Sequence, residues 1–182
     1  AFGMLIAVVA TILFHKVNGE PIGNVGFILL AIAIGSIIGW MVALKVKMTA
    51  MPQLVSLFNG MGGGAAALIS IIEFPHLAHG HPIANMASGE VLAVLLGLII
   101  GSVSLSGSLV AFGKLDGRVK DIRWSLLRYV NVGFVLVLTA FVVYVMTRGE
   151  VIPQSLMPIV YLMLFISLVY GISFVIPIGG AD

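Results

Sequence analysis

The sequence predicts an all-α membrane protein: a polytopic transmembrane helix bundle with about six spanning helices and glycine- and serine-rich helix interfaces. Of its 182 residues, 60% are hydrophobic and 9% are charged, whereas about a quarter of the residues of an average soluble domain carry a charge. The apolar residues form runs long enough to cross a bilayer, separated by segments with Gly, Pro or charged residues. We therefore expect one transmembrane domain over residues 1–182 and no nucleic-acid partner.

Six spanning segments can be placed between the polar breaks. They cover residues of about 1–16, 24–46, 52–73, 88–112, 125–147 and 154–177. The first is short, because the fourteen residues before His15 rise about 21 Å as a helix, against a hydrocarbon core of about 30 Å. The chain also begins with Ala and shows no basic region or cleavage sequence of a signal peptide. These features predict a fragment or a processed product.

The second segment carries small residues at intervals of four, at Ala31, Gly35, Gly39 and Ala43. Small residues at this spacing let two helix backbones approach closely in a membrane. We therefore expect this face to pack against a partner helix.

The segment at 48–74 organises the rest of the chain. Pro52 fits a first helical turn, and an apolar run follows that is interrupted by an amide and four glycines. If this segment is a helix, its polar and small residues share one side. They are Ser56, Asn59, Gly63, Ala66, Ser70 and Glu73. Such a stripe avoids lipid and faces other helices or water between them. It indicates either close helix packing or a hydrated path for ions or protons, and the stripe itself does not choose between them.

The histidines His76, His79 and His81 follow in a predicted loop. Three histidines so close together are compatible with a metal site, but no carboxylate beyond Glu73 completes a ligand set. Collection of protons at the mouth of a path is another interpretation, since histidine titrates near physiological pH. A third interpretation is that these histidines belong to an ordinary polar loop at a membrane face.

The fourth segment has a second stripe, formed by Gly97, Gly101, Ser104 and Ser108, with Gly107 beside it. Serines in membrane helices often bond a carbonyl of their own helix, but their density here favours a polar interior face. Near the start of this segment, Glu90 is either a charge favoured by the helix dipole or an entrance group.

The fifth segment has few interior polar groups, Asn131 and Thr139, and is expected to serve packing and lipid contact. The sixth is expected to close at Pro177, before the ending Gly-Gly-Ala-Asp at 179–182. No cysteine is present, so thiol chemistry and cysteine metal ligands are excluded.

The basic residues predict the orientation in the membrane. One set of loops and helix ends holds Lys45, Lys47, Lys114, Arg118, Lys120, Arg123 and Arg128, and the opposite set holds Lys16 and Arg148. The first set contains seven of the nine basic residues and the second contains two. The positive-inside rule therefore places the first set in the cytoplasm. With six spans, both chain ends would lie there too.

Three stretches resemble the membrane part of the beta subunit of proton-translocating NAD(P) transhydrogenase. They are MTAMPQLVSLFNGMGGGAAA at 48–67, SGSLVAFGKL at 106–115 and GGAD at 179–182. The resemblance implies a proton-translocating membrane domain, coupled to hydride transfer between NADH and NADP⁺ in separate soluble domains. It implies that this chain binds no cofactor itself, and that NADP(H) and NAD(H) bind elsewhere in the complex. It places the chain in a prokaryotic plasma membrane or, in a eukaryote, in the mitochondrial inner membrane.

The resemblance also implies the partners and the site. The partners are the alpha subunit with its membrane helices and NAD(H) domain, an NADP(H)-binding domain beyond Asp182 at the domain junction, and a second copy of the whole complex. Many members carry a histidine tied to proton transfer where this chain has Asn59, and Gly107 and Ser108 match a Gly-Ser pair on the channel helix. With Ser56 and Ser104 from the two stripes, these residues form the expected proton path. Because Asn59 does not titrate near neutral pH, a histidine or carboxylate of another helix or subunit is expected beside it.

Two other classes of protein share these features. A small secondary transporter also has glycine-rich helices and polar residues at the membrane midplane, although no strong internal repeat is evident here. A structural subunit of a respiratory complex would have the same stripes for packing alone. The sequence following Asp182 would distinguish them, because a nucleotide-binding glycine loop there defines a transhydrogenase.

Overall fold

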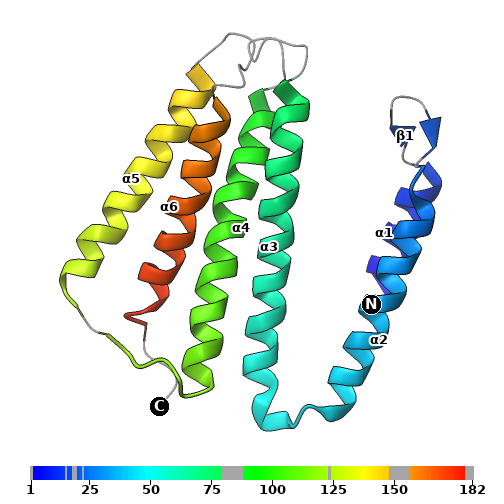
Figure 1. Ribbon diagram of the computed structural model, residues 1–182, viewed down its shortest axis with the longest axis horizontal. Helices are drawn as coiled ribbons and strands as arrows, with labels where there is room; N and C mark the ends of the chain where they lie inside the picture. Colours follow the sequence, from blue (N-terminus) through cyan, green and yellow to red (C-terminus); the bar gives the residue numbers. More distant parts are fainter. Residues whose placement is uncertain are drawn as a thin grey trace. The chain divides into compact units, whose positions relative to one another are not determined.

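The computed structural model describes residues 2–14, 16–17, 20–21, 23–78, 88–122, 124–147 and 156–178, and it confirms an all-α protein (Figure 1). The helices are α1 (Phe2–Phe14), α2 (Val25–Lys45), α3 (Met51–Ala78), α4 (Ser88–Leu115), α5 (Leu126–Thr147) and α6 (Met157–Val175), and a short 3₁₀ turn, η1 (Met48–Ala50), precedes α3. Two-residue strands, β1 (Lys16–Val17) and β2 (Glu20–Pro21), pair antiparallel.

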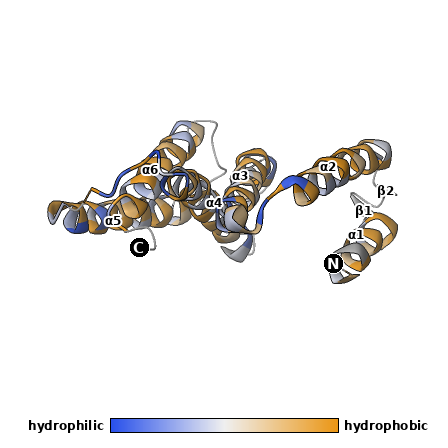
Figure 2. Cartoon of the chain, turned by 90° about the horizontal axis from the view of Figure 1, so that it is seen from below, coloured by the Kyte–Doolittle hydropathy of each residue, from blue (hydrophilic) through white to orange (hydrophobic). Residues whose placement is uncertain are grey.

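Five helices in the described part of the chain are long and apolar enough to cross a membrane, not six. The predicted first span at 1–16 corresponds to α1, whose 13 residues rise about 20 Å, less than the hydrocarbon thickness. The other five predicted spans are confirmed, and hydrophobic residues dominate along their length (Figure 2). The chain is an integral membrane protein.

The chain divides into two compact units, residues 1–48 and 49–182. In the first unit, α2 buries none of its residues, and a Cβ added at Gly35 or Gly39 would meet nothing within 4 Å. The expected close packing of this small-residue face therefore finds no partner in the described residues, and it stays a prediction.

The second unit is a bundle in which α4 is central (Figure 1). Helix α3 runs antiparallel to α4 on one side, α6 packs on the other side of α4, and α5 packs mainly on α6. The core gathers where the end of α3 meets the starts of α4 and α6 and the second half of α5. Its members are Phe74, Val91, Leu95, Leu98, Leu138, Val145, Leu156, Val160 and Met163. Toward the other end of the bundle, small and polar residues replace this apolar core.

Helix α3 continues past the predicted end at 73 to Ala78, through Pro75. A proline in a helix removes one backbone hydrogen bond, here to the carbonyl four residues earlier, and such a loss often ends a helix. Phe74, the residue before Pro75, is fully buried in the core, and burial of this side chain favours continuation of the helix. The predicted loop containing His76 therefore begins later, and His76 lies on the last turn of α3.

Helix α4 ends in a Schellman motif that turns the chain into the polar loop. The N–H groups of Arg118 and Gly117 donate to the carbonyls of Gly113 and Lys114, each at 2.9 Å. Gly117 has φ 73°, a left-handed conformation that favours glycine. The sequence Lys-Leu-Asp-Gly thus fixes where the helix stops.

The predicted orientation can be tested with single cysteines, because the chain has none of its own. A cysteine at Asp116, on the loop after α4, should react with a membrane-impermeant maleimide only from the cytoplasmic side. A cysteine at Gly80, which lies outside the described residues, should react only from the opposite side. Labelling of both positions from one side would contradict the odd number of membrane crossings between them.

Candidate functional site

Helices α3 and α4 cross with almost no side chain between their backbones. A Cβ at Gly63 would lie 2.7 Å from the carbonyl oxygen of Gly101 and 2.7 Å from Cβ of Ser104. A Cβ at Gly101 would lie 2.6 Å from the carbonyl oxygen of Gly63 and 2.7 Å from the nitrogen of Ala67. Because real Cβ atoms do not come within 3.0 Å of other atoms, only glycine fits at this crossing. Close packing is therefore one role of both stripes.

The face of α3 that α4 covers is rotated relative to the predicted stripe. Its buried members are Gly60, Gly64, Ala67, Ser70 and Phe74. Two members of the predicted stripe, Asn59 and Glu73, are exposed in this chain. Helix periodicity identified the correct side of α3 but missed its centre, because Gly60 and Gly64 carry no polar group to mark it.

Near the start of α3, polar side chains of this helix reach α4. The Asn59 Nδ2 donates to Ser108 Oγ at 3.1 Å and to Ser104 Oγ at 3.4 Å. One turn earlier, the Ser56 hydroxyl donates to the Ser108 carbonyl at 2.8 Å. The donors thus face α4, and the Asn59 Oδ1 has no hydrogen-bond partner among the described residues.

These residues line an open groove of about 510 Å³, which we call the Asn59 groove. Its lining is formed by Pro52, Val55, Ser56, Asn59, Val103, Ser104, Gly107, Ser108, Ala111, Phe174 and Val175. All of the residues expected to form the path (Ser56, Asn59, Ser104, Gly107 and Ser108) belong to it. Gly107 faces α6, since a Cβ there would lie 3.0 Å from Cγ2 of Val175.

The Asn59 groove is polar but uncharged. Its lining contains four hydroxyl or amide side chains from α3 and α4, those of Ser56, Asn59, Ser104 and Ser108. Among the described residues, no Asp, Glu, His, Lys or Arg belongs to it. Hydroxyl and amide groups both donate and accept hydrogen bonds, so they can hold a chain of water molecules. Because they do not take up a proton near neutral pH, the groove can conduct protons only if a titratable group of another helix or subunit lies beside it.

The serines of α4 divide between two faces. Ser104 and Ser108 face α3, whereas Ser102 and Ser106 are buried and donate to carbonyls of their own helix, those of Leu98 and Ser102, at 2.6 and 3.0 Å. Ser102 and Ser106 thus bond carbonyls of their own helix, as serines in membrane helices often do. On α6, Ser167 is fully buried, and its hydroxyl has no partner among the described residues.

The remaining predicted positions lie away from the Asn59 groove. Glu90 lies in the exposed first turn of α4, where a carboxylate is favoured by the helix dipole. His79, His81 and Asp182 lie outside the described residues. Within the described ranges, no group of three His, Asp or Glu side chains is placed to hold a metal.

Sequence reasoning missed the role of Lys114, in the last turn of α4. Its side chain is only 5% exposed, and its Nζ donates to Asp121 Oδ1 at 2.6 Å. It also donates to the carbonyls of Ile176 and Ile178, beyond the end of α6, at 2.5 and 2.6 Å. The signal available in the sequence was a lysine at a helix end, which is common and does not identify a second helix as its partner.

Taken together, the spanning helices and the uncharged polar groove between α3 and α4 define a polytopic helical membrane protein with a candidate conduction site. Residues 1–182 match the family described as NAD(P) transhydrogenase beta subunit, and the chain belongs to that family. It is 41% identical over 120 residues to the NAD(P) transhydrogenase subunit beta of Rhodospirillum rubrum, across 64% of this chain. A second Rhodospirillum rubrum sequence with the same name aligns equally well. The aligned stretch spans 25% of the length of these relatives.

Proposed function

We propose that this chain is the proton-translocating membrane part of an NAD(P) transhydrogenase. In the whole complex, hydride passes from NADH to NADP⁺, giving NAD⁺ and NADPH, in soluble domains that hold the two nucleotides. Proton passage through the membrane part drives this transfer by changing how NADP(H) is bound and released. The observation that carries the proposal is the Asn59 groove, which gathers the polar residues of both stripes.

The chemistry of the Asn59 groove supports a water-filled path more than a packing surface alone. Asn59 directs its Nδ2 at two hydroxyls of α4, and its Oδ1 remains available to accept a further hydrogen bond. The glycine crossing at Gly63 and Gly101 lies one turn further along α3 than Asn59. Beside Asn59, the small residues Ser104, Gly107 and Ser108 line the groove and leave room for water. Exposure of these polar groups to lipid would be unfavourable. We therefore expect water or another polar protein surface to cover them.

The groove needs a partner that supplies a titratable group. We assign this role to a histidine or carboxylate on a membrane helix of the alpha subunit, standing within one or two water molecules of Asn59. The NADP(H) domain follows Asp182 on the cytoplasmic side, and the whole complex is a dimer. The membrane is the plasma membrane of a prokaryote or the inner membrane of a mitochondrion.

Replacing Asn59 with leucine tests this function. Leucine keeps a similar volume but removes both hydrogen bonds to α4 and the free acceptor. We expect the complex to assemble in near-normal amount and to lose most of its proton-coupled hydride transfer. The measurements are the yield of assembled complex and the turnover of complex reconstituted in vesicles with a pH-sensitive dye inside.

The matched variant is Asn59→His, which keeps a polar side chain and supplies the residue that many relatives use. Asn59→His should retain turnover. The loss of turnover in Asn59→Leu would then result from the loss of the polar side chain, and not from the mere presence of a substitution at residue 59. If Asn59→Leu assembles fully and turns over like the wild type, the groove is not the path. If it mainly reduces the amount of folded complex, the stripe serves packing only.

A further inference from the structure

A second groove lies at the cytoplasmic ends of α5 and α6. It has a volume of about 560 Å³, and we call it the Arg128 groove; its lining is formed by Trp124, Ser125, Leu127, Arg128, Asn131, Phe174, Pro177 and Ile178. It exists because α5 and α6 pack only over part of their length. The buried residues of α5, Leu138 and Val145, lie in its second half, and the two ribbons diverge toward the start of α5 (Figure 1).

All four polar side chains of this lining, those of Trp124, Ser125, Arg128 and Asn131, carry hydrogen-bond donors. The guanidinium of Arg128 carries five N–H groups and the indole of Trp124 carries one. The Asn131 Oδ1 accepts a hydrogen bond from the Ser173 hydroxyl at 2.7 Å, which leaves the Nδ2 of Asn131 to donate elsewhere. Within the part of the chain that the structure describes, no carboxylate belongs to the lining. Hydrogen-bond donors around a positive charge favour the binding of an anion when no carboxylate competes for them.

Arg128 also lacks a counter-ion among the described residues, as does the exposed Lys120. In the same loop region, Lys114 pairs with Asp121 and Arg118 pairs with Asp116. Arg128 has no ion-pair or hydrogen-bond partner within the described part of the chain, although it lies in the first turn of a spanning helix. An arginine at this depth is stabilised by an anion at the membrane surface, and its planar fork matches the oxygens of a phosphate.

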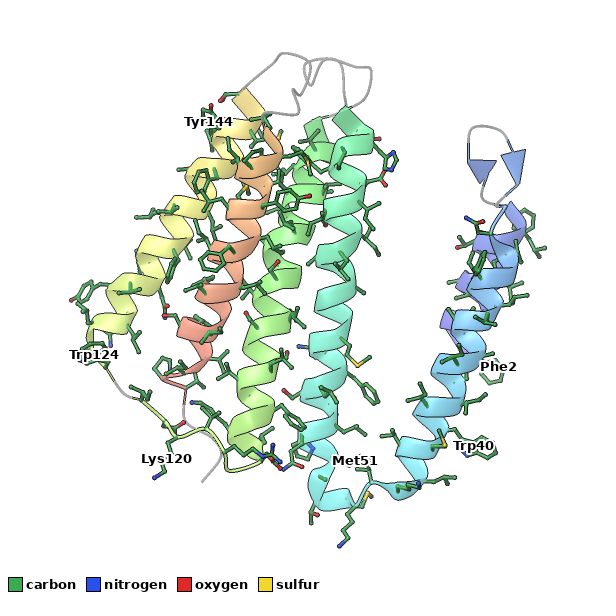
Figure 3. All side chains as sticks on the ribbon, viewed as in Figure 1. Phe2, Trp40, Met51, Lys120, Trp124 and Tyr144 are labelled. Carbon is green, nitrogen blue, oxygen red and sulfur yellow. The ribbon has the colours of Figure 1, made fainter. Side chains whose placement is uncertain are left out.

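The other part of the lining is apolar, from Leu127, Phe174, Pro177 and Ile178. A free phosphate ion would gain nothing from these side chains, whereas the glycerol and upper acyl carbons of a lipid would bury against them. Trp124 lies just before α5 (Figure 3). Indole rings at the ends of membrane spans favour the headgroup region. The groove is therefore suited to one molecule with an anionic head and an apolar tail.

We propose that the Arg128 groove binds one anionic phospholipid of the cytoplasmic leaflet. The guanidinium of Arg128 holds the phosphodiester, the Asn131 amide and the Trp124 indole donate to its oxygens, and the acyl chain follows Phe174 and Ile178 along α6. The leaflet follows from the predicted orientation, in which the basic loops face the cytoplasm. Such a lipid fills the space that the divergence of α5 and α6 leaves open.

Native mass spectrometry of the assembled complex tests the site. Delipidated complex is titrated with phosphatidylglycerol and with phosphatidylcholine, and the binding of the first lipid is measured. We expect the wild type to bind phosphatidylglycerol more tightly, and Arg128→Gln to weaken this binding by about tenfold, the effect of losing a charge-assisted hydrogen bond. The matched control is Lys120→Gln, which removes a positive charge from the same loop region but outside the lining, and it should have a much smaller effect (Figure 3).

Three outcomes would overturn the proposal. The first is equal binding of the two lipids by the wild type, a measurement that needs no variant to fold. The second is an equal loss in Arg128→Gln and Lys120→Gln, which would indicate general attraction of the basic loop. The third is loss of a protein subunit from the Arg128→Gln complex with lipid binding unchanged, which would make the groove a protein-docking site.

Discussion

Replacing Gly63 with alanine is expected to destabilise the pair of α3 and α4 by about 2 kcal/mol or more, the upper part of the range for overpacking a tight interior. The added Cβ would lie 2.7 Å from the Gly101 carbonyl oxygen, a backbone atom that no rotamer change can move. Relief requires the two helices to separate, and that loses contacts along the whole interface. It would also open the Asn59 groove, which lies one turn away on the same two helices.

The control is Gly62→Ala, one residue earlier on the same helix. A Cβ there meets nothing within 4 Å in this chain, so the same chemical change should be neutral or raise stability slightly through helix propensity. Unfolding in mixed micelles and the midpoint of thermal aggregation of the complex measure both variants. Equal stability of Gly63→Ala and Gly62→Ala would show that the helices do not cross as closely as described here.

The sequence predicted the spanning helices and the polar residues of the two stripes, because both depend on local patterns. Long apolar runs define spans, and a polar group recurring every three or four residues defines a helix face. The residues Ser56, Asn59, Ser104 and Ser108 could therefore be assigned to two polar stripes, one on each helix, before their contacts were known. The first segment was expected to be short, with fourteen apolar residues before His15, and α1 accordingly ends at Phe14.

The pairing of the two helices could not be derived in the same way. Periodicity tells which side of a helix is buried, but it does not tell which residue of α4 lies opposite Gly63, and a shift by one turn keeps both patterns intact. Glycines also leave no polar mark, so the burial of Gly60 and Gly64 had no signal. The participation of α6, through Phe174 and Val175, depends on packing between residues far apart in the sequence.

Lys114→Met is expected to lower stability by about 2 kcal/mol, because removing a buried charged donor leaves its acceptors unpaired. The Lys114 ammonium has three N–H donors, and the structure gives it three acceptors: the carbonyls of Ile176 and Ile178 and the carboxylate of Asp121. Two of these lie just past the end of α6, where helix carbonyls have no partner in their own helix. Lys114 therefore joins the end of α4 to the chain that leaves α6.

This connection has a consequence under the proposed function, since the chain leaving α6 leads to Asp182 and the nucleotide domain. Lys114→Met should reduce proton-coupled hydride transfer beyond the loss of folded complex, because α4 lines the Asn59 groove and loses its tie to the domain junction. The matched control is Arg118→Met, whose side chain is 81% exposed and whose ion pair with Asp116 should be worth less than about 1 kcal/mol. Thermal stability and coupled turnover per assembled complex separate the two effects. Wild-type stability in Lys114→Met would contradict the buried hydrogen bonds, and normal coupling in a destabilised variant would limit Lys114 to a structural role.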